Sequence, residues 1–147
     1  MSDVRELYQQ LILDHGRKPR NFGSLDSATH IRHGVNPLCG DHLVLYVEIK
    51  DEVISSIKFD GDGCAISLAS ASLMTEALLG LSVQAAQKLF NDFHNLVAGD
   101  NNMVSSLGKL EVLGGVSAYP ARVKCATLAW QTLNSALTND SGEVTTE

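Results

Sequence analysis

The sequence Asn36-Pro37-Leu38-Cys39-Gly40-Asp41 determines how the rest of this chain can be arranged. Pro37 restricts one backbone angle and removes a hydrogen-bond donor, and Gly40 permits backbone angles that are closed to other residues. These residues are therefore expected to form a short loop. The loop would direct Cys39 and Asp41, a thiol and a carboxylate two residues apart, outward from firmer structure.

The residues after this loop alternate between apolar and more polar side chains, which is the pattern of a half-buried strand. The apolar positions are Leu43, Leu45, Val47 and Ile49. The pattern resumes after a turn at Asp51-Glu52, with apolar residues at Val53, Ile57 and Phe59. A shorter strand is expected over residues 29–35, before the loop. These three runs predict a small three-stranded antiparallel sheet.

Most of the other apolar residues recur at helical spacing. The spacing predicts helices over residues 3–15, 66–79, 82–99, 107–113 and from 120 onward. The second of these is apolar or small on all sides, so it should be buried. Strands followed by a run of helices predict an α+β fold, in which about five helices cover one face of the sheet.

Length and composition limit what such a fold can do. A chain of 147 residues with 44% hydrophobic residues predicts one domain over residues 1–147, with a frayed polar tail over residues 139–147. Eleven basic and seventeen acidic residues give a net charge of −6, which disfavours binding to nucleic acid or to an anionic membrane. The expected partner is another protein.

The compartment is inferred from what the sequence does not contain. No run of about eighteen apolar residues is present, and the first residues have the charges of a helix start rather than of a signal peptide. We therefore expect a cytoplasmic protein without a membrane segment. Three cysteines are an odd number, and in a reducing compartment thiols act as ligands or nucleophiles more often than as disulfide halves.

The other two cysteines are each predicted near the start of a helix. Cys64 ends the sequence Gly61-Asp62-Gly63-Cys64, where a strand turns into a helix, and Cys125 follows Pro120 by five residues. The positive end of a helix dipole and its free amides favour the thiolate, which is the form that binds metal and attacks sulfur. We therefore expect Cys39, Asp41, Cys64 and Cys125 to form one metal site.

Other interpretations of these residues are open. Spacing alone would also allow three small, buried, structural thiols. The glycine pair before Cys64 could belong to a phosphate loop, but the Walker lysine and serine are missing. The histidines are scattered and are interpreted as surface or packing residues, and one of them, His42, adjoins Asp41. They are His15, His30, His33, His42 and His94.

Together these motifs resemble the NifU N-terminal, IscU-like family of iron-sulfur assembly proteins, and most of all its SufU branch, over residues 3–138. The resemblance depends on Asp14-His15, Pro19-Arg20-Asn21, the loop quoted first, Gly61-Asp62-Gly63-Cys64-Ala65-Ile66-Ser67, Ala69-Ser70-Ala71-Ser72, and Tyr119-Pro120-Ala121-Arg122-Val123-Lys124-Cys125-Ala126-Thr127-Leu128. The cluster-scaffold branch differs in two ways. Its Leu-Pro-Pro-Val-Lys sequence is absent here, and Lys124 replaces its histidine. Residues 91–108 also resemble the insertion of the SufU branch.

The resemblance implies a zinc protein that accepts persulfide sulfur from a SufS-type cysteine desulfurase and passes it to downstream Suf assembly proteins. By the family pattern, Cys39, Asp41, Cys64 and Cys125 would bind zinc, Cys39 would accept the sulfur, and Arg122 would support the site. If the protein is an enzyme, the resemblance implies a zinc-dependent sulfurtransferase.

Two other functions fit the same ligands. Three thiolates and a carboxylate suit zinc, but they could also hold a 2Fe-2S cluster on a scaffold that assembles and transfers it. A domain folded by structural zinc that only binds a partner would use these ligands too.

Overall fold

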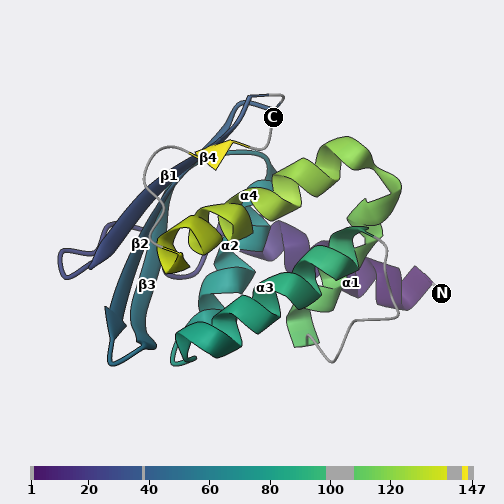
Figure 1. The fold of residues 1–147 in the computed structure, drawn as a ribbon. Coiled ribbons are helices and arrows are strands. Elements are labelled where there is room, and N and C mark those ends of the chain that lie inside the picture. The colour runs from purple at the N-terminus through teal and green to yellow at the C-terminus, as the bar shows by residue number, and fades with distance from the viewer. Residues whose placement is uncertain (1, 38, 99–107, 139–143, 146–147) are drawn as a thin grey trace.

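The computed structural model describes residues 2–37, 39–98, 108–138 and 144–145. Within these residues, a four-stranded sheet carries five helices on one of its faces (Figure 1). The α+β class and the one-sided arrangement of the helices are as predicted. The elements in chain order are α1 (Ser2–Arg17), β1 (His30–Asn36), β2 (Asp41–Lys50), β3 (Val53–Asp62), α2 (Ala65–Leu78), α3 (Val83–Ala98), the 3-10 helix η1 (Gly108–Ala118), α4 (Pro120–Leu137) and β4 (Val144–Thr145).

The sheet has the strand order β3-β2-β1-β4, and its first three strands are antiparallel as predicted. Asp51 and Glu52 connect β2 to β3 with positive φ angles of 53° and 62°, which suits the right-handed twist of a tight hairpin. The expected count of three strands is wrong by one, because β4 pairs in parallel with β1. Val144 and Thr145 thus belong to the sheet, and the rest of the tail expected over 139–147 lies outside the described residues.

The helices form two layers over the sheet (Figure 1). α4 packs on β1 and β2, and α2 packs on β3, while α1 lies against α2 and α3 lies against α4 and η1. The apolar face of β2 meets these helices through fully buried side chains, including Leu43 and Leu45. Between α3 and α4, the buried rings of Phe93 and Trp130 stack with centroids 4.4 Å apart. The core therefore lies between the sheet and the helices.

Polar residues near the end of α1 hold this helix in position. The buried His15 ring has Nδ1 2.7 Å from the Ser72 hydroxyl oxygen, and that oxygen also accepts the Arg20 backbone N–H at 2.8 Å. Asn21 donates from its amide to the Thr75 hydroxyl at 3.1 Å. Burial is the main cause that lowers the pKa of His15. His15 is thus a packing residue that joins α1 to α2, as the sequence suggested.

Helix boundaries differ from the predicted ones by one or two residues, except at η1. That helix was expected to end at residue 113 but continues to Ala118 as a 3-10 helix. The insertion expected over residues 91–108 falls partly on 99–107, outside the described residues. Among the described helices, none has the length and apolar composition needed to cross a membrane.

Candidate metal centre

The β1–β2 hairpin positions two of the four predicted ligands. Asn36 and Asp41 face each other in the strand register, and both are almost fully buried, at 0% and 2% exposure. Gly40 has a φ of 73°, a left-handed angle that suits glycine, and it closes the loop between them. Cys39 lies exposed in this loop. The hairpin therefore turns Asp41 inward and leaves Cys39 at the surface, so the expectation that both point outward is wrong for Asp41.

The junction between β3 and α2 positions Cys64. Cys64 is the N-cap of α2, where its Sγ accepts the Ser67 backbone N–H at 3.4 Å, so the predicted helix start is confirmed. The Cys64 backbone N–H donates to Asp41 Oδ1 at 2.9 Å. A Cβ atom on Gly63 would lie 2.9 Å from the same oxygen. Glycine at this position therefore lets the β3–α2 junction approach the Asp41 carboxylate.

Cys125 is fully buried in the second turn of α4. The Ser70 hydroxyl of α2 donates to the carbonyl of Ala126 at 2.6 Å and accepts the Trp130 indole N–H at 3.1 Å. These bonds hold α4 against α2 beside the thiol. The effect of a helix dipole is confined to its first turn, so the expected stabilisation of this thiolate by a helix start is wrong for Cys125.

Three of the four predicted ligands come together in a group of metal-binding size. The ligand atoms of Cys39, Asp41 and Cys125 all lie within 4.8 Å of one another. The two sulfur atoms of Cys39 and Cys125 are 3.3 Å apart, although 86 residues separate them in sequence. Cys64 is not part of this compact group. Its thiol is one of the causes that raise the pKa of Cys125, after burial and a hydrogen bond with Cys39.

The site favours positive charge. Burial is the largest cause that raises the pKa of the Cys125 thiol, and contacts with the thiols of Cys39 and Cys64 raise that pKa further. Arg122 lies one turn before Cys125 on α4, and the charge of Cys64, followed by a hydrogen bond to Cys125, raises the pKa of Arg122. The raised pKa favours the neutral Cys125 thiol, and a cation would be needed for these thiols and the carboxylate to be charged together, because buried like charges repel one another. Arg122 supplies one positive charge, and a metal ion would supply two or more.

Asn36 is a site residue to which the sequence analysis assigned no function. Its buried amide nitrogen lies 3.3 Å from Asp41 Oδ2 and 3.6 Å from Cys125 Sγ, so it bridges two of the grouped ligands. The position of Asn36 opposite Asp41 in the hairpin is the feature that could have identified it as a site residue. Among the described residues, the buried side-chain atoms without a hydrogen-bond partner are Asn36 Oδ1 and Ser67 Oγ. Both residues contact the site, which fits a centre that holds a further polar group or ion.

The donor atoms also fit particular metals. Thiolate sulfur combined with a carboxylate suits zinc or an iron-sulfur cluster, whereas magnesium and calcium prefer oxygen ligands alone. His42 is exposed and follows Asp41 on β2, so its side chain lies on the opposite face of the strand. It does not join the group.

Replacing Asn36 with leucine should weaken metal binding while leaving the fold in place. The leucine keeps a similar volume but removes the donor shared by Asp41 and Cys125, and loss of such outer contacts typically costs about 10–100-fold in metal affinity. Competition with a chromophoric chelator measures the effect. Asn91→Leu, on the exposed side of α3, is the matched control. Equal affinity in Asn36→Leu and the wild-type protein would contradict this role.

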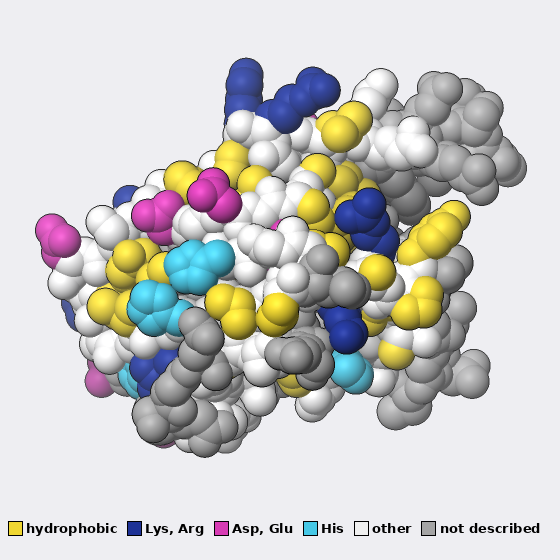
Figure 2. All heavy atoms as spheres, turned by 90° about the horizontal axis from the view of Figure 1, so that it is seen from above, with side chains coloured by type: hydrophobic (Ala, Val, Ile, Leu, Met, Phe, Trp, Pro, Cys, Tyr) yellow, Lys and Arg dark blue, Asp and Glu magenta, His cyan; other side chains and the backbone are white. Residues whose placement is uncertain are grey.

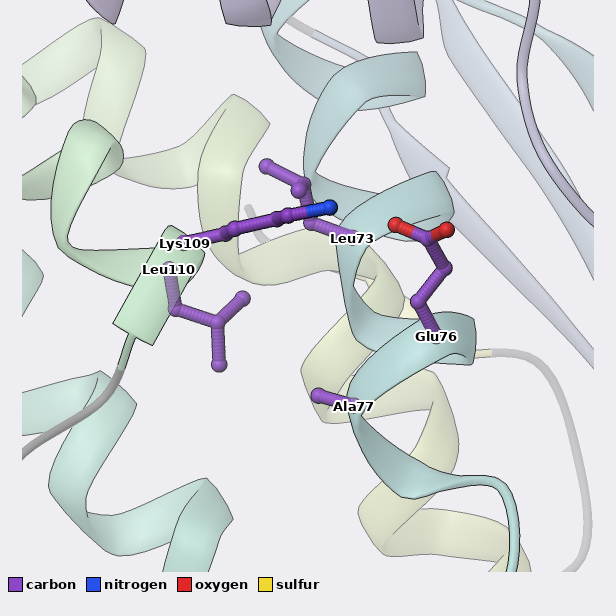
Figure 3. A pocket seen from close by; sticks show the side chains of 5 residues that line it. All are labelled: Leu73, Glu76, Ala77, Lys109 and Leu110. Carbon is purple, nitrogen blue, oxygen red and sulfur yellow. The ribbon is translucent and has the colours of Figure 1, made fainter.

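Two hollows lie outside the thiol centre and contain none of its candidate ligands. A cleft of about 280 Å³ lies between α2 and η1, and the Glu76 carboxylate and Lys109 amino group point toward one another across it (Figure 3). An apolar groove of about 560 Å³ includes Ile66 and Arg122 in its lining, next to the segments that carry Cys64 and Cys125. Neither hollow has a thiol or imidazole among its described lining residues, so neither is a second candidate for the thiol-based centre.

A one-sided α+β domain that gathers thiols and a carboxylate from a hairpin, a helix cap and a second helix defines a class of small proteins with a sulfur-rich metal centre. Residues 7–140 match the family model of the NifU-like N-terminal domain, and the chain belongs to this family. It is 39% identical over 142 residues to the zinc-dependent sulfurtransferase SufU of Bacillus subtilis, covering 96% of each chain.

Two further comparisons agree with this family. The chain is 39% identical to the iron-sulfur cluster assembly scaffold protein IscU of Streptococcus pyogenes, covering 93% of this chain and 86% of that protein. It also matches a crystal structure from Fervidobacterium islandicum, proposed to be an iron-sulfur cluster assembly scaffold for the SUF system. That match has a TM-score of 0.81 and 34% identity, and covers 90% of this chain and 98% of the other. The predicted resemblance and fold are confirmed.

Proposed function

We propose that this protein is a zinc-dependent sulfur carrier of iron-sulfur cluster assembly, in which Cys39 accepts persulfide sulfur. The observation that carries the proposal is that the three thiols differ in exposure and in the structural element that holds them. Cys39 is exposed on a hairpin loop, Cys64 caps a helix and Cys125 is buried in one. Cys39 is the most exposed of the three, and its sulfur can meet a partner without moving a packed helix.

Zinc would be held by Cys39, Asp41, Cys64 and Cys125. When bound, zinc keeps such thiols deprotonated at neutral pH. The protein's own residues prepare the other features of the site. The Cys64 backbone N–H and the Asn36 amide hold the Asp41 carboxylate in one orientation. Arg122 places a positive charge beside the three sulfurs.

In the transfer that we propose, the Cys39 thiolate attacks the terminal sulfur of a persulfide on the partner. The sulfur–sulfur bond of the donor breaks and a new one forms at Cys39 Sγ. The donor cysteine leaves as a thiolate with the electron pair of the broken bond, so no external oxidant or reductant is needed. Cys39 then carries the persulfide to a downstream acceptor.

The partners follow from the same proposal. A SufS-type cysteine desulfurase would supply the sulfur, and downstream Suf assembly proteins would receive it, in the cytoplasm. The similarity to the Bacillus subtilis sulfurtransferase supports this proposal. If the transfer is catalytic, the protein acts as a zinc-dependent sulfurtransferase.

A desulfurase activation assay tests the proposal. Turnover of cysteine to alanine by a SufS-type enzyme should increase when this protein is added, because its thiol removes the terminal sulfur of the enzyme's persulfide. The Asn91→Leu variant should stimulate turnover as the wild-type protein does. No stimulation by folded, zinc-loaded protein would reject transfer and leave a zinc-folded module that only binds a partner.

The second candidate function is a scaffold for a 2Fe-2S cluster, because the similar protein of Streptococcus pyogenes is named as a scaffold. The same ligands could hold such a cluster. Lys124 replaces the histidine that the scaffold branch carries before its last cysteine, and this difference favours transfer.

Metal analysis separates these two functions. Protein purified without added iron should contain about one zinc per chain and show no iron-sulfur absorption in the visible range, since one group of four ligands fills one tetrahedral site. Elemental analysis and an absorption spectrum provide the measurement. Stoichiometric iron and sulfide after anaerobic purification would instead support the scaffold.

A further inference from the structure

A pair of exposed histidines lies on the sheet outside the thiol centre. His33 on β1 and His42 on β2 have ring centroids 6.1 Å apart, with the ring planes inclined by 34°. In the strand register His33 faces Val44 and His42 faces Val35, so the two histidines are diagonal neighbours. The side chains of diagonal neighbours can reach one another across two antiparallel strands. A pair of histidine side chains lies side by side on the face that Figure 2 shows.

The pair belongs to the face of the sheet that the helices leave open. Along β2, Asp41 and Leu43 are buried under the helices, whereas His42 between them is exposed. Successive residues of a strand point to opposite faces, so His42 and Asp41 cannot bind the same ion without unwinding the strand. Asp62 faces His42 across the β2–β3 ladder and is exposed as well. A carboxylate therefore lies on the same open face as the two imidazoles.

The two rings keep their nitrogen atoms available for a ligand. Among the described residues, neither His33 nor His42 makes a side-chain hydrogen bond or an ion pair, apart from the contact between the two rings. Neutral imidazole is a preferred ligand of zinc, copper and nickel. In the structure the ligand atoms of His33, His42 and Asp62 do not all lie within 4.8 Å of one another. Each ligand atom must come within about 2 Å of the metal, so these exposed side chains would have to rotate to bind it.

We propose that His33 and His42, with Asp62 as a third ligand, form a second binding site for a divalent transition metal of the zinc class. The site lies on the open face of the sheet, and it is independent of the thiol centre and of sulfur transfer. Water would occupy the remaining coordination positions. Asp60 faces Val44 on the same open face and is diagonal to His42, but its carboxylate already accepts the Gly61 backbone N–H. Such an open site exchanges its metal readily, and protein purified without added metal would still contain about one zinc per chain.

Calorimetric titration of Zn²⁺ into zinc-loaded, tag-free full-length protein tests the site. The wild-type protein should bind a second zinc, and the His33→Gln/His42→Gln double variant should lose it. His94→Gln, which changes an exposed histidine on α3, should retain the second zinc. In NMR spectra, the ring signals of His33 and His42 should shift during the titration, while those of His94 should stay in place.

Opposite results would overturn the proposal. The absence of a second zinc in the wild-type protein, or its retention in the double variant, would exclude a site at this histidine pair. Asp62→Asn should bind the second zinc more weakly. An unchanged affinity in that variant would exclude the carboxylate as a ligand.

Discussion

Replacing Cys39 with serine should reduce sulfur acceptance from a cysteine desulfurase to background. A serine hydroxyl is not deprotonated at neutral pH and forms no persulfide, so the loop loses its acceptor. Cys64 and Cys125 cannot replace it, because one caps α2 through its sulfur and the other is fully buried in α4. Moving either sulfur to a partner would disturb packed helices. Mass spectrometry after incubation with desulfurase and cysteine measures the persulfide.

A second variant shows whether exposure alone makes a thiol an acceptor. Ser24 lies exposed on the connection between α1 and β1, so Ser24→Cys in the Cys39→Ser background offers a surface thiol outside the site. This thiol should remain unmodified, since neither Arg122 nor a metal activates it. A persulfide on Cys64 or Cys125 in folded, zinc-loaded wild-type protein, with Cys39 unmodified, would refute the assignment.

Removing the metal should lower the melting temperature on the order of 10 °C. A ligand present at about 1,000 times its dissociation constant stabilises the folded state by roughly 4 kcal/mol, and each 1 kcal/mol shifts the melting temperature of a domain this size by about 2–4 °C. The physical reason is that the ligands come from three separate segments: the β1–β2 hairpin, the start of α2 and the second turn of α4. Circular dichroism at rising temperature, before and after chelation, gives the measurement.

The experiment needs a reductant, because Cys39 Sγ and Cys125 Sγ are 3.3 Å apart and a disulfide between them could replace the metal as a cross-link. A Cys125→Ser variant should show a much smaller shift on chelation, since its site already lacks a ligand. The apolar core between the sheet and helices should keep the metal-free chain folded at low temperature. An unchanged melting curve after verified metal removal would show that the metal contributes nothing to stability.

Local sequence patterns were sufficient for most of the fold. Alternation along β2 and helical spacing along α3 reflect which face of each element is buried, and that periodicity is present in the chain itself. The parallel strand β4 was missed for a physical reason. Val144 and Thr145 form a strand only because β1 offers them an edge, and two residues contain no period of their own.

The sequence by itself determined the types of candidate ligand and the segments that carry them, because proline, glycine and helix-start signals act over a few residues. Only the tertiary structure decided the burial of those ligands and their positions relative to one another. The hairpin register brings Asn36 against Asp41, and the contact of α2 with α4 buries Cys125 beside Cys39. The same register turns His42 away from Asp41 and toward His33. These relations join residues far apart in the chain, so they exist only after the strands pair and the helices pack.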